Sequence, residues 1–331
     1  MNEFAVVVPY FGQFKPSIKI FLESCNRNPE VDWFFFTDCQ VPNGVALHRN
    51  VHWISSTLEN IRRLAEDKLG QKVALYRSYK LCDLKPFYGA IFGDYLAGYS
   101  YWGYGDVDVI YGRLNVFLSE IKKKQYDKIN WMGHLCFIRN TKETNSVPFL
   151  HKKGTLSAEE VLAAEKNLGF DERDFNLKCL ESGMKIYTGR WAADIDIFYW
   201  RMRCVSLGTL RCLLDIPYIK WAPTNYSKQV FALVDGAVYR IYLKRGKVHR
   251  EEFAYIHFRK EVPIRLDCIA CRTFLITREG FFSVPEGERA LLNYTTVKQL
   301  ILKFNNQENR FQELYCFGFQ LYRKVTGKRG W

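Results

Sequence analysis

The chain has 331 residues, 48% hydrophobic and 16% aromatic, so it is long enough to bury a sizeable core and too apolar to be disordered. Its formal net charge of +13 favours phosphate groups or an anionic membrane surface as partners. No zinc-finger spacing, RNA-binding aromatic signature or base-reading basic helix accompanies this charge, so we expect no nucleic-acid partner. No run approaches the roughly 18 apolar residues that a membrane-spanning helix needs.

The ten cysteines are scattered through apolar stretches, and the first residues, Met-Asn-Glu-Phe-Ala, lack the basic and apolar regions of a signal peptide. Both features favour the reducing cytoplasm and free, buried thiols. Cys268 and Cys271 form the one closely spaced pair. Since neither a second pair nor two histidines follow them, we expect no zinc site there.

The first part of the chain alternates apolar runs with helical patterns. Strands are predicted at residues 4–12, 31–38 and 51–54, and helices at 16–26 and 56–70. Strands made of continuous apolar residues and joined by helices are typical of a parallel α/β sheet. Ligands of such sheets bind beyond the carboxyl ends of the strands, where Pro9, Tyr10 and Asp38 lie.

A helical stretch with charged residues follows at residues 79–92. Leucine and aromatic side chains form its apolar stripe, and Pro86 predicts a break or a fresh helix start. The predicted polar face carries Lys80, Asp83 and Lys85, close to the end of the acidic strand that comes next. Ordinary surface charge is the alternative explanation for these three residues.

Two carboxylates interrupt the apolar run at residues 102–112. Because side chains at i and i+2 of an extended segment point to the same side, Asp106 and Asp108 are predicted to face one point, with Val107 in the core. Paired carboxylates at the end of an apolar strand favour a divalent cation with oxygen ligands, Mn²⁺ or Mg²⁺, that carries a phosphate-bearing ligand. For an Asp-x-Asp pair considered alone, a solvated strand end is the alternative.

The order of these features resembles the GT-A class of sugar-nucleotide glycosyltransferases. Lys-Leu-Cys-Asp-Leu-Lys-Pro at 80–86, followed by Tyr-Trp-Gly-Tyr-Gly-Asp-Val-Asp-Val-Ile-Tyr-Gly at 101–112, is similar to a bacterial group from capsule and O-antigen gene clusters. The resemblance covers about residues 4–260. It implies that Asp106 and Asp108 hold the metal and touch the ribose or diphosphate of the donor.

The same resemblance implies further contacts with the donor. Lys85 or Lys80 would neutralise phosphate, or contact the donor sugar together with Asp83. Asp38 and the region of Tyr10 would contact the nucleoside. Each role suits the residue type, since an ammonium group attracts phosphate and a turn at a strand end accommodates a flat base.

Several residues further along are candidates for the acceptor side. Residues 131–140 are predicted to form a strand with His134 near its start; in GT-A enzymes this strand lines the sugar pocket, and a structural histidine is the alternative. Residues 144–153 are predicted as a loop, and Ser157 with Glu160 predicts a capped helix start.

Two groups of acids come next. Asp171 and Glu172 follow a turn, and the resemblance puts such acids near the acceptor hydroxyl, which one of them would deprotonate or orient. Plain surface turn residues are the alternative. Asp194 and Asp196 form a second Asp-x-Asp without the glycine-rich aromatic approach of the first, and Asp194 remains an acceptor-side candidate.

Residues 215–250 are predicted as irregular strands and turns, and the strand after them delivers His257 and then Lys260. This ending resembles that of metal-dependent GT-A enzymes, of retaining more than inverting type. There the histidine is the third metal ligand and the lysine grips the diphosphate leaving group, so that both stabilise the charge that develops on it. A structural histidine is again the alternative.

From about residue 295 the chain is basic and aromatic. Its predicted helical stripe consists of Val297, Leu300, Ile301 and Phe304. Such helices suit docking on an anionic membrane surface. Helices that pack on the catalytic domain, or a dimer contact, are the alternatives.

Together these features predict an α/β protein with a GT-A-like mixed sheet, a Rossmann-like nucleotide-binding half and a C-terminal helical tail. The predicted domains are a catalytic one at 1–262, with halves 1–112 and 113–262, and an extension at 263–331. The predicted function is that of a cytoplasmic hexosyltransferase at the inner face of the cell membrane. It would use Mn²⁺ or Mg²⁺ and a UDP-hexose, first UDP-galactose, and act on a lipid-linked or polysaccharide acceptor.

Two other functions stay open at this point. A sugar-phosphate or nucleotidyl transferase could use the same acids and lysines, although Pro-Tyr-Phe-Gly at 9–12 is a poor phosphate loop. A basic, membrane-associated protein that binds glycans without catalysis is the other. The sequence leaves the oligomeric state open.

Overall fold

The computed structural model describes residues 2–189, 191–196, 203–204, 225–226, 228–258, 272–277, 280–284 and 287–305. The chain divides into two compact units. Among the described residues, the first unit comprises 2–109 and 114–189, and the second comprises 110–113 and everything from 191 onward. Residues 110–113 surround the predicted border near residue 112, and the predicted border near residue 262 lies outside the described residues.

The first unit is built on a seven-stranded mixed sheet of order β3-β2-β1-β4-β7-β6-β8. Its strands are β1 (Phe4–Tyr10), β2 (Val31–Thr37), β3 (Val51–Ser55), β4 (Tyr101–Gly105), β6 (Lys128–Ile129), β7 (Leu135–Arg139) and β8 (Ile186–Tyr187). Strands β1 to β4 run parallel to one another, whereas β7 is antiparallel to both β4 and β6. The predicted α/β class and the parallel N-terminal strands are therefore confirmed.

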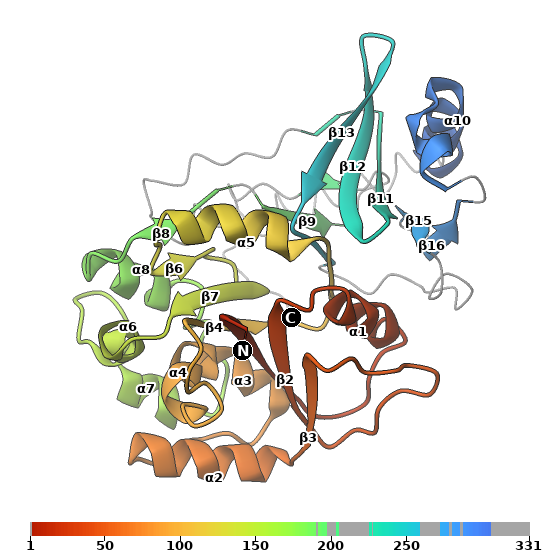
Figure 1. The fold of residues 1–331 in the computed structure, drawn as a ribbon. Helices are drawn as coiled ribbons and strands as arrows, with labels where there is room; N and C mark the ends of the chain where they lie inside the picture. The colour runs from red at the N-terminus through yellow and green to blue at the C-terminus, as the bar shows by residue number, and fades with distance from the viewer. Residues whose placement is uncertain are drawn as a thin grey trace, which may run out of the picture. The chain divides into compact units, whose positions relative to one another are not determined.

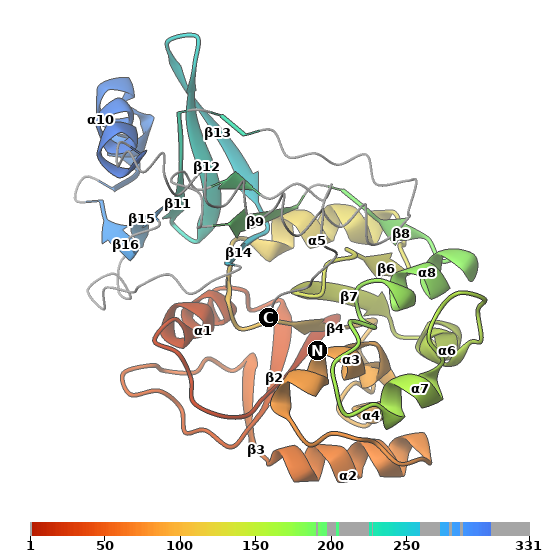
Figure 2. The same cartoon turned by 180° about the vertical axis from the view of Figure 1, so that it is seen from behind.

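Helices cover both faces of this sheet (Figures 1 and 2). They are α1 (Ile18–Asn26), α2 (Leu58–Leu69), α3 (Leu81–Leu84), α4 (Tyr88–Ile91), α5 (Leu114–Lys123), α6 (Lys142–Ser146), α7 (Ala158–Ala163) and α8 (Asp174–Glu181), with 3₁₀ turns η1 (Ser78–Lys80), η2 (Lys85–Phe87) and η3 (Val147–Phe149). Side chains of α2, α4, α7 and α8 share one core with Phe34 and Phe36 of β2. Phe35 points to the other face, where its ring packs against Phe21 of α1.

Local sequence explains where these helices start and stop. Helix α2 begins after Thr57, whose side chain accepts a hydrogen bond from the Asn60 N–H, and ends at Gly70, which has a φ of +66°. The predicted capping box of Ser157 and Glu160 opens α7. Pro86 lies in η2, where the helical stretch at 78–91 changes into a new short turn, as predicted.

The second unit contains two sheets among its described residues. One has the order β10-β9-β14-β5, and the other is antiparallel with the order β13-β12-β11-β15-β16. The strands are β5 (Val109–Tyr111), β9 (Ala192–Asp196), β10 (Arg203–Cys204), β11 (Gln229–Val234), β12 (Ala237–Lys244), β13 (Lys247–Phe253), β14 (Tyr255–Phe258), β15 (Thr273–Thr277) and β16 (Gly280–Ser283). A 3₁₀ turn, η5 (Gly287–Leu292), and helix α10 (Tyr294–Asn305) complete the unit.

Two predictions of irregular structure were wrong. The predicted loop at 144–153 contains the end of α6 and all of η3, because Thr141 caps α6 with a capping box. The region at 215–250, predicted as irregular strands and turns, is regular from Gln229 onward, where β11, β12 and β13 form two antiparallel hairpins. The first hairpin turns at Asp235 and Gly236, and the second turns at Arg245 and Gly246. All four residues have a positive φ, as in the two-residue turns whose twist matches that of a hairpin.

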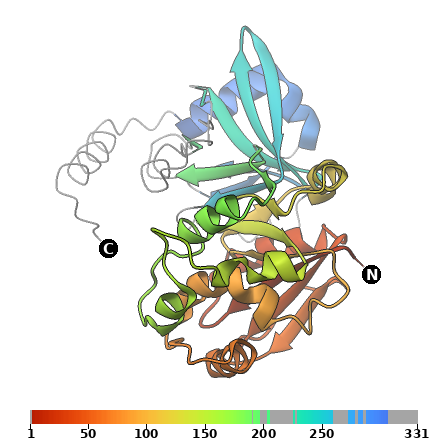
Figure 3. The ribbon, with the colours of Figure 1, turned by 90° about the vertical axis from the view of Figure 1, so that its left-hand side faces the viewer.

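The apolar stripe of α10 is covered by protein. Val297 and Ile301 are buried in one core with the antiparallel sheet, and Leu300 and Phe304 pack against it. Figure 3 shows α10, in blue, beside the strands of this sheet. Of the alternatives for this stripe, packing on the protein is the one observed for residues 294–305. Lys260, Cys268, Cys271 and residues 306–331 lie outside the described residues.

The described part of the chain was searched for membrane-spanning helices and for paired cysteines. No helix there is long and apolar enough to cross a membrane, as predicted. The cysteines that can be described there are free thiols, and four of the six are buried.

Candidate functional site

The carboxyl ends of β1, β2 and β4 lie at one edge of the first sheet, because the three strands are parallel. Tyr10 ends β1 opposite Thr37 of β2, and Asp38 follows directly. The Asp38 carboxylate accepts a hydrogen bond of 3.1 Å from the Gly12 N–H, in a turn where Gly12 has a φ of +113°. The Tyr10 ring stacks on Phe14 at 4.7 Å. The structure thus brings Tyr10 and Asp38 together at the predicted edge.

The chain leaves β4 at Asp106 and bends at Val107 and Asp108, which corrects the prediction of an extended strand. The chain passes there from β4 to β5, which belong to different sheets. Val107 is therefore half-buried, although we expected it in the core. The carboxylate oxygens of the two aspartates still approach within 4.8 Å of each other. The Asp106 side chain is 34% exposed and Asp108 is exposed, so both can reach a ligand from solvent.

Lys85 connects this bend to two other segments. Its ammonium group donates a hydrogen bond of 2.6 Å to Asp106 and one of 3.0 Å to the carbonyl of Gly133. It also lies 3.7 Å from the carboxylate of Asp171. The predicted neighbourhood of Lys85 and Asp106 is therefore present, and Asp171, predicted on the acceptor side, joins the same cluster. We call Lys85, Asp106 and Asp171 the lysine–aspartate cluster.

The cluster has unusual proton affinities. Burial raises the pKa of Asp171 to about 7, against the opposing effect of Lys85, and the nearby carboxylates of Glu172 and Asp106 raise it further. Burial acts to lower the pKa of Lys85, but the charge of Asp106, followed by Cys82 and Asp171, outweighs it and raises that pKa well above its ordinary value. Lys85 is therefore charged at neutral pH, while Asp171 gains and loses its proton there. A carboxyl group of this kind suits general acid–base catalysis.

The turn before β7 leaves room for this cluster. A Cβ atom on Gly133 would lie 2.7 Å from a carboxylate oxygen of Asp171, so a side chain there would displace this carboxylate, whereas its 3.6 Å separation from the Lys85 nitrogen is an ordinary contact. His134 follows in the same turn, its side chain buried and its carbonyl accepting a hydrogen bond from the Asp106 N–H. Residues 131–134 thus form a turn, and the predicted strand begins later, at Leu135.

A buried pair of polar residues that the sequence analysis missed supports this turn. The side-chain amide of Asn176 in α8 donates to the Trp131 carbonyl at 2.9 Å, and its oxygen accepts from the Lys128 ammonium at 2.7 Å. Both side chains are fully buried. No pattern in the sequence marks them, since Asn176 and Lys128 lie 48 residues apart.

Lys80 and Asp83 have a different role from the one predicted. Both side chains are buried, and the Lys80 ammonium donates to Asp83 at 2.8 Å and to the Val161 carbonyl at 2.8 Å. Asp83 in turn accepts hydrogen bonds from the N–H groups of Leu168 and Phe170. The pair therefore holds the loop that leads to Asp171. Its burial and protein partners argue against direct contact with a donor.

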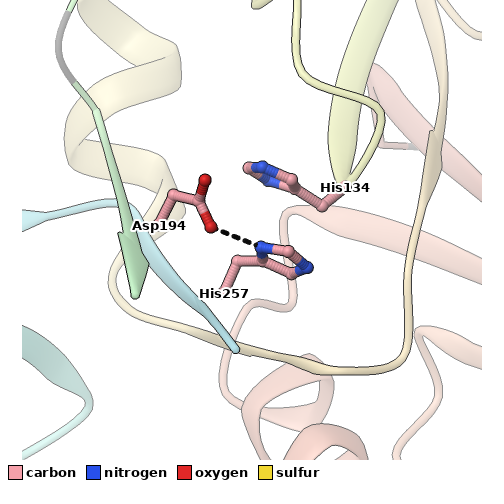
Figure 4. Close-up of side chains that lie close together, drawn as sticks. All are labelled: His134, Asp194 and His257. Carbon is pink, nitrogen blue, oxygen red and sulfur yellow. Dashed lines mark hydrogen bonds and ion pairs between the residues drawn. The ribbon is translucent and has the colours of Figure 1, made fainter. Parts of the chain in front are cut away.

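In the second unit, two further candidates contact each other. Asp194 in β9 and His257 in β14 are register partners on neighbouring parallel strands. The Nδ1 atom of His257 lies 2.8 Å from a carboxylate oxygen of the buried Asp194 (Figure 4). Such a carboxylate fixes the tautomer and the orientation of an imidazole ring. This contact was not predicted.

The donor atoms at the bend suit a hard cation. Asp106 and Asp108 offer carboxylate oxygens, the ligands that Mg²⁺ and Mn²⁺ prefer, at the solvent-accessible end of a strand. Glu172, also exposed, adds a further carboxylate beside Asp171.

Two comparisons with known proteins were made, one with curated proteins and one with models of protein families. A search of curated proteins finds no match. The model of the family DUF6625, described as a family of unknown function, matches residues 6–285, a span that includes every site residue discussed above. Because that span is most of the 331 residues, this chain belongs to the DUF6625 family.

Proposed function

We propose that this protein is a metal-dependent glycosyltransferase with a GT-A-type fold. It would move a hexose from a nucleotide sugar to a surface-polysaccharide acceptor, and UDP-galactose is the first donor to test. The observation that carries the proposal is the lysine–aspartate cluster at the carboxyl edge of the parallel strands, where α/β proteins bind their ligands. The resemblance of the sequence around Lys85 and Asp106 gives the reaction class.

The donor side uses the residues at the ends of β1, β2 and β4. Asp106 and Asp108 would hold Mn²⁺ or Mg²⁺, which when bound offsets the negative charge of the diphosphate. Lys85 adds a fixed positive charge beside Asp106. Tyr10 and Asp38, at the neighbouring strand ends, would contact the nucleoside.

Asp171 is the residue proposed to act on the acceptor. With a pKa near neutrality it can accept the proton of an attacking hydroxyl group, and Lys85 at 3.7 Å stabilises the carboxylate form. Glu172 and His134 are proposed to contact the sugars. The Lys80–Asp83 pair contributes by holding the segment before Asp171 in place.

His257 is proposed as a third metal ligand because of its place late in the sequence. Metal-binding histidines commonly have a carboxylate on the ring nitrogen that does not bind the metal, and Asp194 is such a partner. In this role Asp194 orients the ligand, in place of the predicted contact with the acceptor. Lys260, proposed to grip the leaving diphosphate, lies outside the described residues.

A lipid-linked acceptor would place the enzyme at the cytoplasmic face of the cell membrane. The basic residues beyond 305, outside the described part of the chain, are the segment proposed to reach an anionic surface. The apolar stripe of α10 is excluded from this role, because the protein itself covers it.

A panel of nucleotide sugars tests the proposal. The purified protein is incubated with Mn²⁺ and each donor, and release of UDP or GDP is measured with and without oligosaccharide acceptors. We expect slow hydrolysis of one donor, loss of that activity in Asp108→Ala, and full activity in Asp67→Ala, a matched change at an exposed aspartate of α2. No binding of any nucleotide sugar to the native protein, or equal turnover by Asp108→Ala, contradicts the proposal. Release of pyrophosphate instead would indicate a nucleotidyl transferase.

A further inference from the structure

The hairpin of β12 and β13 ends in a cluster of exposed cations. Its two-residue turn begins at Arg245 and joins Lys244 to Lys247, which are register partners on the two strands. Lys228 lies beside this end of the hairpin, because its carbonyl accepts a hydrogen bond of 3.0 Å from the Leu243 N–H. We call the four cationic residues, all of them exposed, the basic tip: Lys228, Lys244, Arg245 and Lys247.

Among the described residues, no acid neutralises the basic tip. Residues 242–250 contain neither aspartate nor glutamate, and the ion pairs of the described part of the chain involve none of the four cations. The acids of the hairpin itself, Glu251 and Glu252, lie nearer its other end, where they pair with Arg240 and Arg113. Like charges gathered in this way repel one another, so the basic tip favours a partner with many negative charges.

The basic tip extends past the neighbouring strand of its sheet. The pairing of β11 with β12 begins at Gln229 and Tyr242, so the pair of Lys244 and Lys247 lies beyond the first residue of β11. Figure 1 shows the turn of this hairpin, in teal, past the end of β11. A flat surface can therefore touch the tip before it touches β11.

The part of the hairpin behind the tip is firmly held. Leu243 and Val248 pack against the core that the sheet shares with α10. The ring of Tyr242 stacks on that of Tyr226 at 3.7 Å and on that of His249 at 5.3 Å. A surface that is ordered before it binds loses little conformational entropy on binding. Both tyrosines are half-exposed, and tyrosine side chains are enriched where a membrane meets water.

Nucleic acids and anionic lipid head groups are the two polyanions that such a surface could bind. Single-stranded nucleic acids are bound along grooves of cations, with aromatic rings on which the bases stack. Here the cations gather at one end of a narrow hairpin, and the Tyr242 ring already stacks with two other rings. An anionic bilayer presents a plane of negative charge, which attracts a projecting group of lysine and arginine residues without requiring a groove. The observations therefore favour the bilayer.

We propose that the basic tip docks the protein on an anionic lipid bilayer. The lysine and arginine side chains contact the lipid phosphates, and the two tyrosines lie at the level of the head groups. This surface is additional to the segment beyond residue 305. Docking requires no substrate, so the inference does not rest on the proposed transferase activity.

Co-sedimentation with lipid vesicles tests the proposal on the full chain. The vesicles contain about two parts phosphatidylcholine to one part phosphatidylglycerol, at roughly 100 mM salt to screen distant charges. A variant with Lys244→Gln, Arg245→Asn and Lys247→Gln is expected to bind at least about tenfold more weakly than the native protein. The turn is retained in this variant, because Asn-Gly is a pair that two-residue hairpin turns prefer.

The matched control removes three charges from another run of exposed lysines. It carries Lys122→Gln, Lys123→Gln and Lys124→Gln, at the end of α5. Two of these lysines are already paired with acids, Lys122 with Glu3 and Lys123 with Glu120. The control is therefore expected to bind within about twofold of the native protein. Thermal unfolding of each variant verifies that it is folded.

Each outcome decides the matter in one direction. Weaker binding in the basic-tip variant alone supports docking through the hairpin. Equal weakening in the control, or no binding of the native protein to these vesicles, overturns it. A single-stranded oligonucleotide is titrated in parallel; loss of oligonucleotide binding with unchanged vesicle binding would identify a nucleic-acid surface and would also overturn the proposal. These measurements contain no nucleotide sugar, so failure of docking and failure of the transferase proposal are distinguishable.

Discussion

Lys80 and Asp83 form an ion pair of 2.8 Å in which the side chains are 1% and 0% exposed. Each partner also has backbone partners: Lys80 donates to the Val161 carbonyl, and Asp83 accepts from the N–H groups of Leu168 and Phe170. Segments 81 to 87 residues apart in the sequence are joined at this one point. The pair is therefore a structural support for the segment that carries Asp171.

Removing one partner leaves the other charge buried without compensation. Lys80→Met is expected to lower the free energy of unfolding by about 3–5 kcal/mol. Urea unfolding followed by circular dichroism measures this loss. Lys68→Met is the matched control, because Lys68 pairs at 2.7 Å with Asp94, whose side chain is 77% exposed, and a solvent-exposed pair contributes far less. Equal losses in the two variants would show that the Lys80 pair is not the support inferred here.

The raised pKa of Asp171 predicts how the stability of the protein changes with pH. Its folded-state pKa, about 7, lies above the ordinary 3.8, so the folded protein binds the proton more tightly than the unfolded chain. The stability from this group is complete below pH 3.8 and is lost as the pH rises through 7. Asparagine does not ionise, so the Asp171→Asn variant does not lose this stability. Between pH 3.8 and 7, the free energy of unfolding of the native protein should therefore fall by about 1.4 kcal/mol per pH unit relative to that of Asp171→Asn.

Urea unfolding of both proteins at pH 5 and pH 8 measures this relative loss. A stability difference that stays constant with pH, or that changes in the native protein's favour as the pH rises, contradicts a raised pKa for Asp171.

The edge of the sheet could be predicted from the sequence because apolar runs identify parallel strands and the chemistry follows at their carboxyl ends. Tyr10 and Asp38 were predicted there on that basis, and the structure brings both to that edge. Lys85 was predicted on a helical face close to the end of the strand that carries Asp106, and the two side chains are in contact. The sequence could not predict that Lys80 forms a buried ion pair whereas Lys85 contacts Asp106. Short 3₁₀ and α turns alternate around Pro86, so no single helical period shows which lysine points to the site and which into the protein.

Pairing between residues far apart in the sequence explains other features that could not be predicted. The Asp194–His257 contact depends on the register of two parallel strands whose residues are 63 apart in the sequence. By contrast, the hairpin of β11 and β12 has a readable signal, Asp235-Gly236, which the sequence analysis did not use. The bend at Asp106–Asp108 exists because the next strand, β5, joins another sheet, which only the tertiary structure reveals.

The space at Gly133 predicts a specific energetic coupling. Gly133→Ala puts a Cβ atom 2.7 Å from the Asp171 carboxylate and should cost about 1–3 kcal/mol of stability. In an Asp171→Ala background the obstructing oxygen is absent, so the same change should cost much less. A double-mutant cycle of unfolding free energies measures the coupling. Additive effects of the two substitutions would mean that Gly133 and Asp171 do not contact each other.

Helix α10 allows protein packing and membrane docking to be separated. Ile301 is 4% exposed in the core that α10 shares with the antiparallel sheet, whereas its neighbour Leu302 is 46% exposed. Ile301→Ala should lower the free energy of unfolding by about 2–5 kcal/mol, and Leu302→Ala should change it by less than about 0.5 kcal/mol. Binding of both variants to anionic liposomes is measured in parallel. If Ile301→Ala released the protein from liposomes without loss of stability, the stripe would face lipid; a loss of stability with unchanged binding assigns it to the core, and any membrane contact must then come from another surface.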